Sequence, residues 1–338
     1  MSADAAPESG EFLDEMRALA LIALREWDLA VADLAPLKVR ENAVFRVDLA
    51  DGGRAVLRVH RSGYHSDAEL DAEFVWMRAL AESGISVPRV IRSRLGRDFE
   101  VIAMPRGTRQ IDVFEWIDGR QLGSVESGVH GDAAAIAEQY WMIGATAARM
   151  HNHGREWRCP AGFRRHAWDA EGLVGEQPFW GRFWELAALT PGQKDLLLRA
   201  RAKIAEELTA YGTGPDRYGL IHADLVPENL LVDGGRVRVI DFDDAGFGWH
   251  LFELATSLYF ITGESVYPAA RDALIRGYRG EREMSEAALA WLPLFLAARG
   301  TTYLGWVHTR QGSQTARELT PFLVERACVV AEEYFAMC

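Results

Sequence analysis

Residues 220–244 read Leu-Ile-His-Ala-Asp-Leu-Val-Pro-Glu-Asn-Leu-Leu-Val-Asp-Gly-Gly-Arg-Val-Arg-Val-Ile-Asp-Phe-Asp-Asp. One apolar pair, Leu220-Ile221, enters a loop, and a second apolar run leaves it at 230–232. Asp-Gly-Gly at 233–235 then turns the chain, and residues 237–240 return as a strand. The return strand ends at Asp241. The polar side chains should therefore gather at one end of a two-stranded ribbon: His222, Asp224, Asn229, Asp241 and Asp243.

Such a cluster suits phosphoryl transfer. This chemistry needs a carboxylate that orients a hydroxyl and accepts its proton, and hard oxygen ligands for Mg²⁺. The alternative is a turn-rich hairpin with solvated carboxylates, which is the usual role of an isolated Asp or Asn in a loop. The joint spacing of the five residues argues against that alternative.

The pattern His-x-Asp-x-x-x-x-Asn, followed by Ile-Asp-Phe-Asp, resembles the catalytic and metal loops of the aminoglycoside phosphotransferase and choline kinase superfamily. Within it, the pattern is most similar to the branch of bacterial stress-response kinases and related small-molecule kinases. The resemblance implies that Asp224 is the catalytic base and that Asn229 and Asp241 bind Mg²⁺. It also implies that Asp243 assists through a second metal or a water, and that His222 braces the loop.

The order of predicted elements fits the protein-kinase-like fold of that superfamily. We expect an α+β, bilobal molecule: a small lobe with an antiparallel sheet over residues 1–118, and a large, mainly helical lobe over residues 119–338. Apolar spacing predicts a first helix, and Ser-Asp-Ala-Glu at 66–69 is a capping box that opens a second. The predicted small-lobe elements are helices 11–27 and 66–82 and strands 37–49, 54–60, 99–104 and 111–117.

Arg58 lies on the third predicted strand, where the resemblance places the nucleotide-binding Lys of most relatives. This is a departure, although Arg keeps the positive charge and can fork onto two phosphate oxygens. Glu73, one turn beyond Glu69 on the capped helix, is its predicted ion-pair partner. The alternative is that these are surface charges of an amphipathic helix. The substitution leaves open whether nucleotide handling is altered or weakened.

Two further segments are candidates for nucleotide contacts. Residues 40–45, which include Asn42, lie between the first two predicted strands, where related kinases carry a phosphate-covering loop. An ordinary hairpin turn is the alternative there. Phe-Glu-Trp-Ile-Asp-Gly at 114–119 resembles the hinge, and we expect the Glu115 carbonyl and the Ile117 N–H to meet an adenine ring. The alternative for this segment is a plain strand end.

Other features bear on positioning. We expect Glu253 to anchor the catalytic loop, and His151 and His153 to close a helix over 133–150 without binding a metal. Six tryptophans crowd the predicted large lobe, either as a cation–π box for an ammonium substrate or as core and groove-wall residues: Trp168, Trp180, Trp184, Trp249, Trp291 and Trp306.

Composition narrows the class of protein. The chain has 338 residues, 49% of them hydrophobic, a net charge of −12 and three separated cysteines. We therefore expect a cytoplasmic protein with reduced thiols, no signal peptide and no membrane span. The acidic balance argues against nucleic-acid binding and is compatible with a cationic substrate. The oligomeric state and a preference for ATP over GTP are left open.

Together these features predict an ATP- and Mg²⁺-dependent phosphotransferase. The expected acceptor is a hydroxyl of a small molecule, such as an amino alcohol, an aminoglycoside-like compound or a related metabolite. Two alternatives remain: a protein Ser/Thr kinase of the stress-response type, and a nucleotide-binding pseudokinase scaffold. Arg58 alone favours the scaffold, whereas Asp224, Asn229 and Asp241 argue against it.

Overall fold

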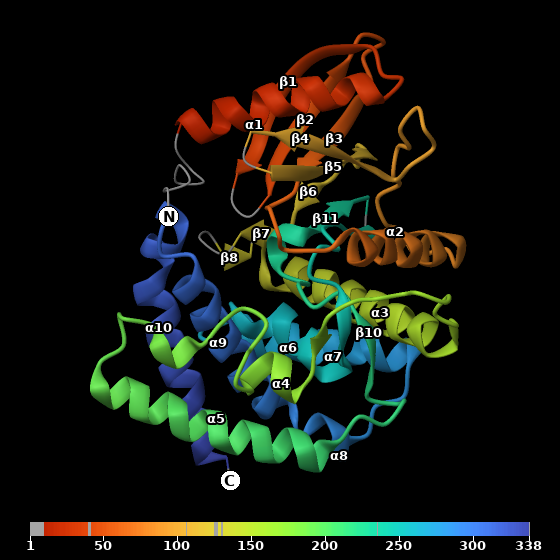
Figure 1. Ribbon diagram of the computed structural model, residues 1–338. Coiled ribbons are helices and arrows are strands. Elements are labelled where there is room, and N and C mark those ends of the chain that lie inside the picture. Colours follow the sequence, from red (N-terminus) through yellow and green to blue (C-terminus); the bar gives the residue numbers. More distant parts are fainter. Residues whose placement is uncertain are drawn as a thin grey trace.

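The computed structural model describes residues 10–39, 42–105, 107–124, 128–129, 131–234 and 236–337. A twisted antiparallel sheet forms the upper part of the molecule, and helices with short strand ribbons fill the lower part (Figure 1). The predicted α+β class, with an antiparallel sheet followed by a mainly helical region, is confirmed.

The boundaries of the elements are as follows. The helices are α1 (Gly10–Ala23), η1 (Leu24–Glu26), α2 (Asp67–Glu82), α3 (Ala133–Glu156), α4 (Ala170–Val174), η2 (Phe183–Glu185), α5 (Pro191–Tyr211), η3 (Pro227–Asn229), α6 (His250–Tyr259), α7 (Tyr267–Glu281), α8 (Glu286–Leu289), α9 (Leu292–Thr309) and α10 (Gln314–Ala336). The strands are β1 (Val31–Val39), β2 (Ala43–Leu49), β3 (Arg54–Val59), β4 (Phe99–Met104), β5 (Gly107–Glu115), β6 (Arg120–Gln121), β7 (Gly123–Ser124), β8 (Gly128–Val129), β9 (Ala167–Trp168), β10 (Tyr218–Ile221), β11 (Leu230–Asp233), β12 (Arg236–Val239) and β13 (Gly246–Trp249).

The upper sheet has the order β1-β2-β3-β5-β4, and every neighbouring pair is antiparallel. Side chains of strand β3 alternate between the two faces of this sheet. Leu57 and Val59 point into a core shared with α1, whereas Val56 and Arg58 point to the opposite face. That opposite face is covered by α2, which begins at the predicted Ser66 capping box. Alternation along one strand therefore sends Arg58 towards the rest of the molecule.

Strand boundaries differ from the predicted ones at two places. β1 starts at Val31, six residues before the predicted start, and contains Pro36. Proline is tolerated there because β1 is an edge strand, and the register shifts between Pro36 and Lys38. β5 runs from Gly107 to Glu115 instead of over 111–117, because its polar first half pairs with β4 along its whole length.

The helical part is built around α9, a helix whose residues are mostly buried. The predicted end of the 133–150 helix is wrong: α3 continues to Glu156, so His151 lies within the helix and is buried. α3 packs very closely on α7. A Cβ at Gly144 would lie 2.0 Å from the Leu274 carbonyl oxygen, and one at Gly277 would lie 1.9 Å from that of Trp141. Glycine is required at both places by this close approach.

The predicted ribbon of 230–232 and 237–240 is present as β11 and β12, with β6 added beside β11. Leu220 and Ile221 belong to a different ribbon, in which β10 pairs with β13 and β13 pairs with β9. The two ribbons place the β10–β11 and β12–β13 connections next to each other. Because β6 pairs with β11, the chain just after Asp118 joins the lower part, which supports our proposal of a lobe boundary there.

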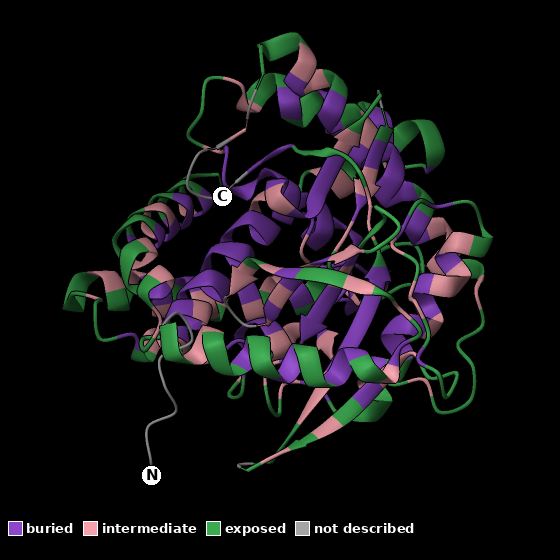
Figure 2. Cartoon of the chain, turned by 90° about the horizontal axis from the view of Figure 1, so that it is seen from above, coloured by how far each residue is buried: buried purple, intermediate pink, exposed green. Residues whose placement is uncertain are grey.

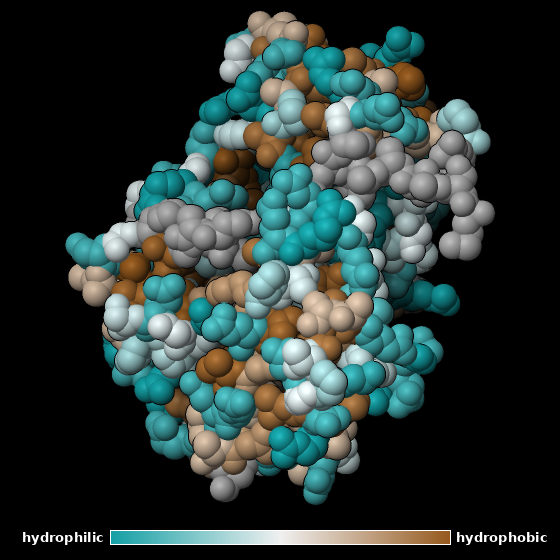
Figure 3. Space-filling view, turned by 90° about the vertical axis from the view of Figure 1, so that its left-hand side faces the viewer, coloured by the Kyte–Doolittle hydropathy of each residue, from teal (hydrophilic) through white to brown (hydrophobic). Residues whose placement is uncertain are grey.

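Burial follows this architecture: buried residues fill the interior, and exposed residues lie on the outer faces of the helices (Figure 2). On the face shown in Figure 3, hydrophobic and hydrophilic residues are interspersed. Among the described residues, no helix combines the length and the apolar character needed to cross a membrane.

Candidate active site

A carboxylate of helix α6 holds the backbone of the loop between β10 and β11. Glu253, on α6, accepts hydrogen bonds from the backbone N–H of His222 at 2.8 Å and of Ala223 at 2.7 Å. Ala223 has a φ of 65°, a left-handed conformation that a residue with a Cβ rarely adopts. The predicted anchoring by Glu253 is confirmed, and it explains how this unfavourable backbone conformation is stabilised.

His222 joins this loop to the next one. Its Nδ1 accepts a hydrogen bond from the Asp224 N–H at 3.2 Å, and its Nε2 lies 3.0 Å from the Ile240 carbonyl oxygen. The proton must therefore be on Nε2, which donates to the carbonyl. Burial lowers the pKa of His222, so the neutral ring is favoured. These contacts are those of a brace between the two loops.

Asp224 lies at the end of a short polar chain. Its Oδ2 accepts a hydrogen bond from Asn229 Nδ2 at 2.7 Å, and its Oδ1 accepts one from Arg299 Nη2 at 2.8 Å. Arg299 is fully buried and also donates to the Ala223 carbonyl oxygen and to the Tyr303 hydroxyl. The buried guanidinium fixes the carboxylate and compensates its charge.

Asn229, Asp241 and Asp243 lie beside this carboxylate. Asn229 uses its Nδ2 for Asp224, so its Oδ1 is the atom that could serve as a metal ligand. Asp241 has a φ of 64°, and its side chain is 43% exposed. Asp243 is buried, and its Oδ1 is among the buried atoms of the described residues that have no hydrogen-bond partner. This orphaned carboxylate oxygen and two further oxygen donors fit a divalent cation such as Mg²⁺.

Charges around the two aspartates act in opposite directions. Although the Asp241 side chain is partly exposed, desolvation of its carboxyl group, opposed by Arg58 and reinforced by Asp243, raises the pKa of Asp241. Burial works the same way on Asp243, but its close contacts with His60 and His65 and the positive charge of Arg58 hold the pKa of Asp243 well below its usual range.

Arg58 lies within reach of the predicted partner Glu73, with Nη2 to Oε1 at 2.8 Å. A second carboxylate, Asp112 on β5, accepts from the same Nη2 at 2.8 Å and from Nε. The remaining nitrogen, Nη1, lies 3.6 Å from Asp241 and 3.8 Å from Asp243. Glu73 and Asp112 are both fully buried, so the guanidinium is the charge partner of two buried carboxylates.

His60 adds a positive charge to this group. Its Nε2 lies 2.6 Å from Asp112 Oδ2. Burial and the charge of Arg58 both lower the pKa of His60, but Asp112 and Asp243 outweigh them and raise it to about 9. Asn42 donates from Nδ2 to Asp243 Oδ2 at 3.2 Å, so its side chain lies beside the predicted metal ligands. Residues 40 and 41 of the predicted phosphate loop lie outside the described residues.

Two cavities meet at these residues. A cleft of about 550 Å³ runs under the sheet and is lined by both predicted hinge residues, Glu115 and Ile117, by apolar side chains, and by Arg58. A smaller pocket of about 110 Å³ is lined by Asp224 and Asp243 together with Asp244, Tyr64, Trp180, Tyr303, Trp306 and Arg310. Asn229 and Asp241 line both cavities.

The tryptophans divide between the two expected roles. Trp168 and Trp249 are buried core residues. Trp180 and Trp306 line the small pocket, and Trp184 and Trp291 pack against the core as partly buried residues. Only two of the six are therefore placed to meet a ligand in that pocket.

This arrangement has known relatives. A family model described as the phosphotransferase enzyme family matches residues 33–289, which is most of the chain. The chain belongs to this family. The resemblance seen in residues 220–244 is thereby confirmed.

Three solved or curated relatives of this phosphotransferase are named as kinases of small molecules. The structure of a microcompartment-associated aminopropanol kinase aligns with a TM-score of 0.84 and 32% identity, over 95% of this chain and 98% of that one. Amicoumacin kinase of Bacillus subtilis (strain 168) is 25% identical over 280 residues, or 79% of this chain and 77% of that protein. Amicoumacin kinase hAmiN in complex with AMP-PNP, Ca²⁺ and Ami shares the fold, with a TM-score of 0.74 and 23% identity over 95% and 94% of the chains.

Sequence reasoning missed Arg299 and Asp112 in this phosphotransferase. Asp112 could have been predicted. Side chains alternate along the predicted 111–117 strand, and Asp112 can lie on the face that Arg58 occupies on the adjacent strand. Arg299 lies 75 residues after Asp224 in a mostly apolar helix. A buried Arg in such a helix needs a carboxylate partner, but the sequence does not identify which one.

Proposed function

We propose that the protein transfers the γ-phosphoryl group of ATP, with Mg²⁺, to the hydroxyl of a small amino alcohol. The observation that carries this proposal is that Asn229 and Asp241 line both cavities, whereas Asp224 lines only the smaller one. A nucleotide in the cleft would point its terminal phosphate at the shared residues, and an acceptor hydroxyl would meet that phosphate from the side of Asp224.

Each residue then has a distinct task. Asp224 orients the acceptor hydroxyl and receives its proton, while Arg299 and Asn229 hold the carboxylate in place. Asn229, Asp241 and Asp243 would hold Mg²⁺, which neutralises charge on the phosphates when it is bound. Arg58 lines the cleft, and its Nη1 is the nitrogen that remains for phosphate oxygens.

The lining of the small pocket supports the amine as well as the hydroxyl. Five acidic side chains line this pocket together with the aromatic rings of Trp180 and Trp306: Asp224, Glu228, Asp241, Asp243 and Asp244. Negative charge and aromatic faces both attract an ammonium group, although Lys38 and Arg310 at the same pocket oppose it. Burial raises the pKa of Asp244 to about 8, so the negative charge comes mainly from the other acidic side chains. The volume of about 110 Å³ favours a short acceptor over an aminoglycoside or a peptide side chain in an extended segment. The named activity of the aminopropanol kinase points the same way.

The test is a panel of acceptors assayed for ADP release from ATP, with and without Mg²⁺. We expect turnover with 1-amino-2-propanol or ethanolamine. The matched diol, 1,2-propanediol, should be poorer by at least about tenfold in kcat/KM, because a desolvated cation–π contact contributes about 2 kcal/mol. Asp241→Asn should abolish the stimulation by Mg²⁺.

Other outcomes would point elsewhere. Equal activity with the diol would remove the amine from the proposal but keep the kinase. Phosphorylation of a peptide or of the protein itself, with no small acceptor used, would favour the protein-kinase alternative. ATP binding with no turnover of any acceptor would favour the scaffold.

A further inference from the structure

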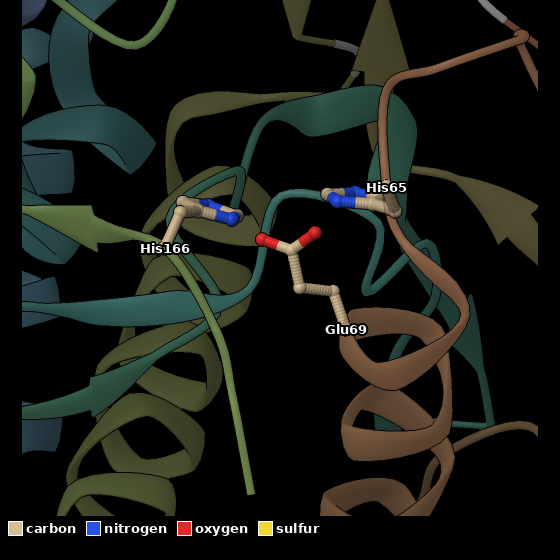
Figure 4. A group of neighbouring side chains, drawn as sticks. All are labelled: His65, Glu69 and His166. Atoms are coloured by element: carbon tan, nitrogen blue, oxygen red, sulfur yellow. The ribbon is translucent and has the colours of Figure 1, made fainter.

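His65, Glu69 and His166 form a cluster next to the proposed active site (Figure 4). His65 comes just before the Ser66 cap of α2, Glu69 is in the first turn of that helix, and His166 comes just before β9. One donor atom of each side chain lies within 4.8 Å of the other two. The two rings are nearly parallel, with centroids 5.8 Å apart, and the Glu69 carboxylate points between them.

The far sides of both rings are fixed by the backbone. His65 Nε2 lies 2.8 Å from the carbonyl oxygen of Asp243, and His166 Nε2 lies 3.0 Å from that of Asp244. A carbonyl oxygen only accepts, so both Nε2 atoms must carry protons and donate. Both Nδ1 atoms are buried, and among the described residues neither has a hydrogen-bond partner. This is the arrangement of metal-binding histidines, whose second nitrogen is held by a backbone carbonyl.

Glu69 is also partly fixed. Its Oε2 accepts hydrogen bonds from Ser66 N and Ser66 Oγ, each at 2.8 Å, as the carboxylate of the capping box. Its Oε1 is the oxygen that remains for another partner. The cluster therefore contains two buried imidazole nitrogens without hydrogen-bond partners and one carboxylate oxygen that the cap does not use. Two adjacent buried acceptors without donors are costly, and a bound cation would remove that cost.

We propose that His65, Glu69 and His166 bind a divalent transition-metal ion of the zinc class, separate from the carboxylate group around Asp241. Two imidazoles and one carboxylate, with water as a fourth ligand, are a ligand set that Zn²⁺ takes. Ligands at about 2.0–2.2 Å from a tetrahedral ion lie about 3.4 Å apart, so ligand atoms that lie within 4.8 Å would close by up to about 1.4 Å. The nearby Arg165 does not leave an uncompensated charge, because its Nη1 lies 3.6 Å from Glu73 Oε2.

An ion bound by these three side chains would connect two parts of the fold. Two ligands come from the segment that opens α2, and the third, His166, immediately precedes strand β9 of the helical part. The same histidines hold the carbonyls of Asp243 and Asp244, in the loop that carries the proposed Mg²⁺ ligands. An ion at this site would tie α2, β9 and the carboxylate loop together. This inference does not depend on the identity of the acceptor.

The experiment is titration of the metal-free full-length protein with Zn²⁺ and, separately, with Co²⁺, in the absence of nucleotide. We expect one equivalent to bind, with the visible absorption of four- or five-coordinate Co²⁺ and a rise in Tm. Glu69→Gln keeps an acceptor for the Ser66 cap, and His166→Gln removes one imidazole. Each should weaken affinity by at least about tenfold, since loss of an outer-sphere partner alone costs 10–100-fold. His308→Gln, at a histidine far along the chain on α9, is the matched control and should bind as the wild type does.

Asp241→Asn separates the two sites. If that variant loses the Zn²⁺ equivalent while Glu69→Gln keeps it, the ion belongs to the catalytic carboxylates and the proposal is wrong. Absence of stoichiometric binding to the wild type would also overturn it. Should His166→Gln not fold, Glu69→Gln with its intact cap decides the question.

Discussion

At the scale of single residues, Asp224 combines two constraints that give it a defined orientation. One oxygen is bound to Arg299 and the other to Asn229, while the carboxylate still lines the small pocket. A carboxylate held in this way can direct one lone pair to an acceptor hydroxyl. The contribution of Asp224 to turnover should therefore depend on the charge of its side chain and much less on the size of that side chain.

Asp224→Asn should lower turnover by about 10²–10⁴-fold with little change in ATP affinity, because the amide cannot accept the proton. The measurement is steady-state kinetics beside a nucleotide titration on the same preparation. Asp233→Asn is the matched control, since Asp233 is an exposed residue at the turn of the β11–β12 ribbon. Turnover within a few-fold of the wild type would remove Asp224 from the role of base.

Arg58 illustrates how a residue can have a structural role beside its predicted one. Arg58→Ala would leave Glu73 and Asp112 buried without their guanidinium, so we expect a loss of about 3–5 kcal/mol in the free energy of unfolding. Arg58→Lys keeps a charge and should lose less. Urea denaturation measures both, and Arg46→Ala, a half-exposed arginine on β2, should cost no more than about 1 kcal/mol.

Calorimetric ATP titration of folded Arg58→Lys then tests the phosphate role separately. Affinity equal to that of the wild type, together with an unchanged affinity in Arg58→Ala, would assign the residue to stability alone.

At the scale of elements, the first turn of α6 supports the catalytic loop through one side chain. Glu253 accepts two backbone N–H groups at positions 222 and 223, beside the left-handed Ala223. Helix α6 is buried along its whole length, so Glu253 cannot move away from the loop. The geometry of Asp224 therefore depends on a helix that contributes no atom to the pocket.

Glu253→Gln replaces one acceptor oxygen by an NH₂ group that faces a buried N–H. We expect a loss of about 1–3 kcal/mol in the free energy of unfolding, and reduced kcat with a smaller change in KM for ATP. The matched change Glu286→Gln, at an exposed residue of α8, should stay within about 0.5 kcal/mol. If Glu253→Gln matched that control in both stability and kcat, the anchoring role would be refuted.

At the scale of the whole molecule, α3 and α6 meet through two stacked histidines. The rings of His151 and His250 lie 4.2 Å apart, both are buried, and His151 Nδ1 lies 2.9 Å from the Tyr278 hydroxyl of α7. Burial, reinforced by Arg282, lowers the pKa of both histidines well below 6.5. Glu253, 3.8 Å from His151, is the nearest acidic group and does not reverse this shift.

The sign of the pH dependence follows from these shifts. Above pH 6.5 the histidines are neutral in both folded and unfolded chains and contribute no pH dependence. Below pH 6.5 they are protonated only in the unfolded chain, so each lowers the free energy of unfolding by about 1.4 kcal/mol per pH unit. Titratable groups elsewhere act in both directions, so the informative quantity is the difference between wild type and His151→Gln. Urea denaturation between pH 7 and 5 should show a shallower decline in the variant, and parallel curves would contradict the assignment.

The sequence determined the catalytic motifs, the capped α2 helix, the β11–β12 ribbon and the fold class, because each depends on contacts between residues close in the chain. Ser66 with Glu69, and Asp233 with its Gly-Gly turn, are local features of this kind. The pairing of Arg58 with Glu73 could be predicted because a strand and the next helix form one short unit.

Only the tertiary structure decided which distant side chains complete the site. Arg299 binds Asp224, which lies 75 residues earlier in the chain, and Asp112 binds Arg58, which lies 54 residues earlier. The ring of His166 stacks on that of His65, although the two residues are far apart in the sequence. Nothing in local spacing specifies such pairs, since they depend on how α9, β5 and β9 pack. The same packing formed the two cavities and placed Asn229 and Asp241 between them, because a cavity is a property of many elements meeting and of no single segment.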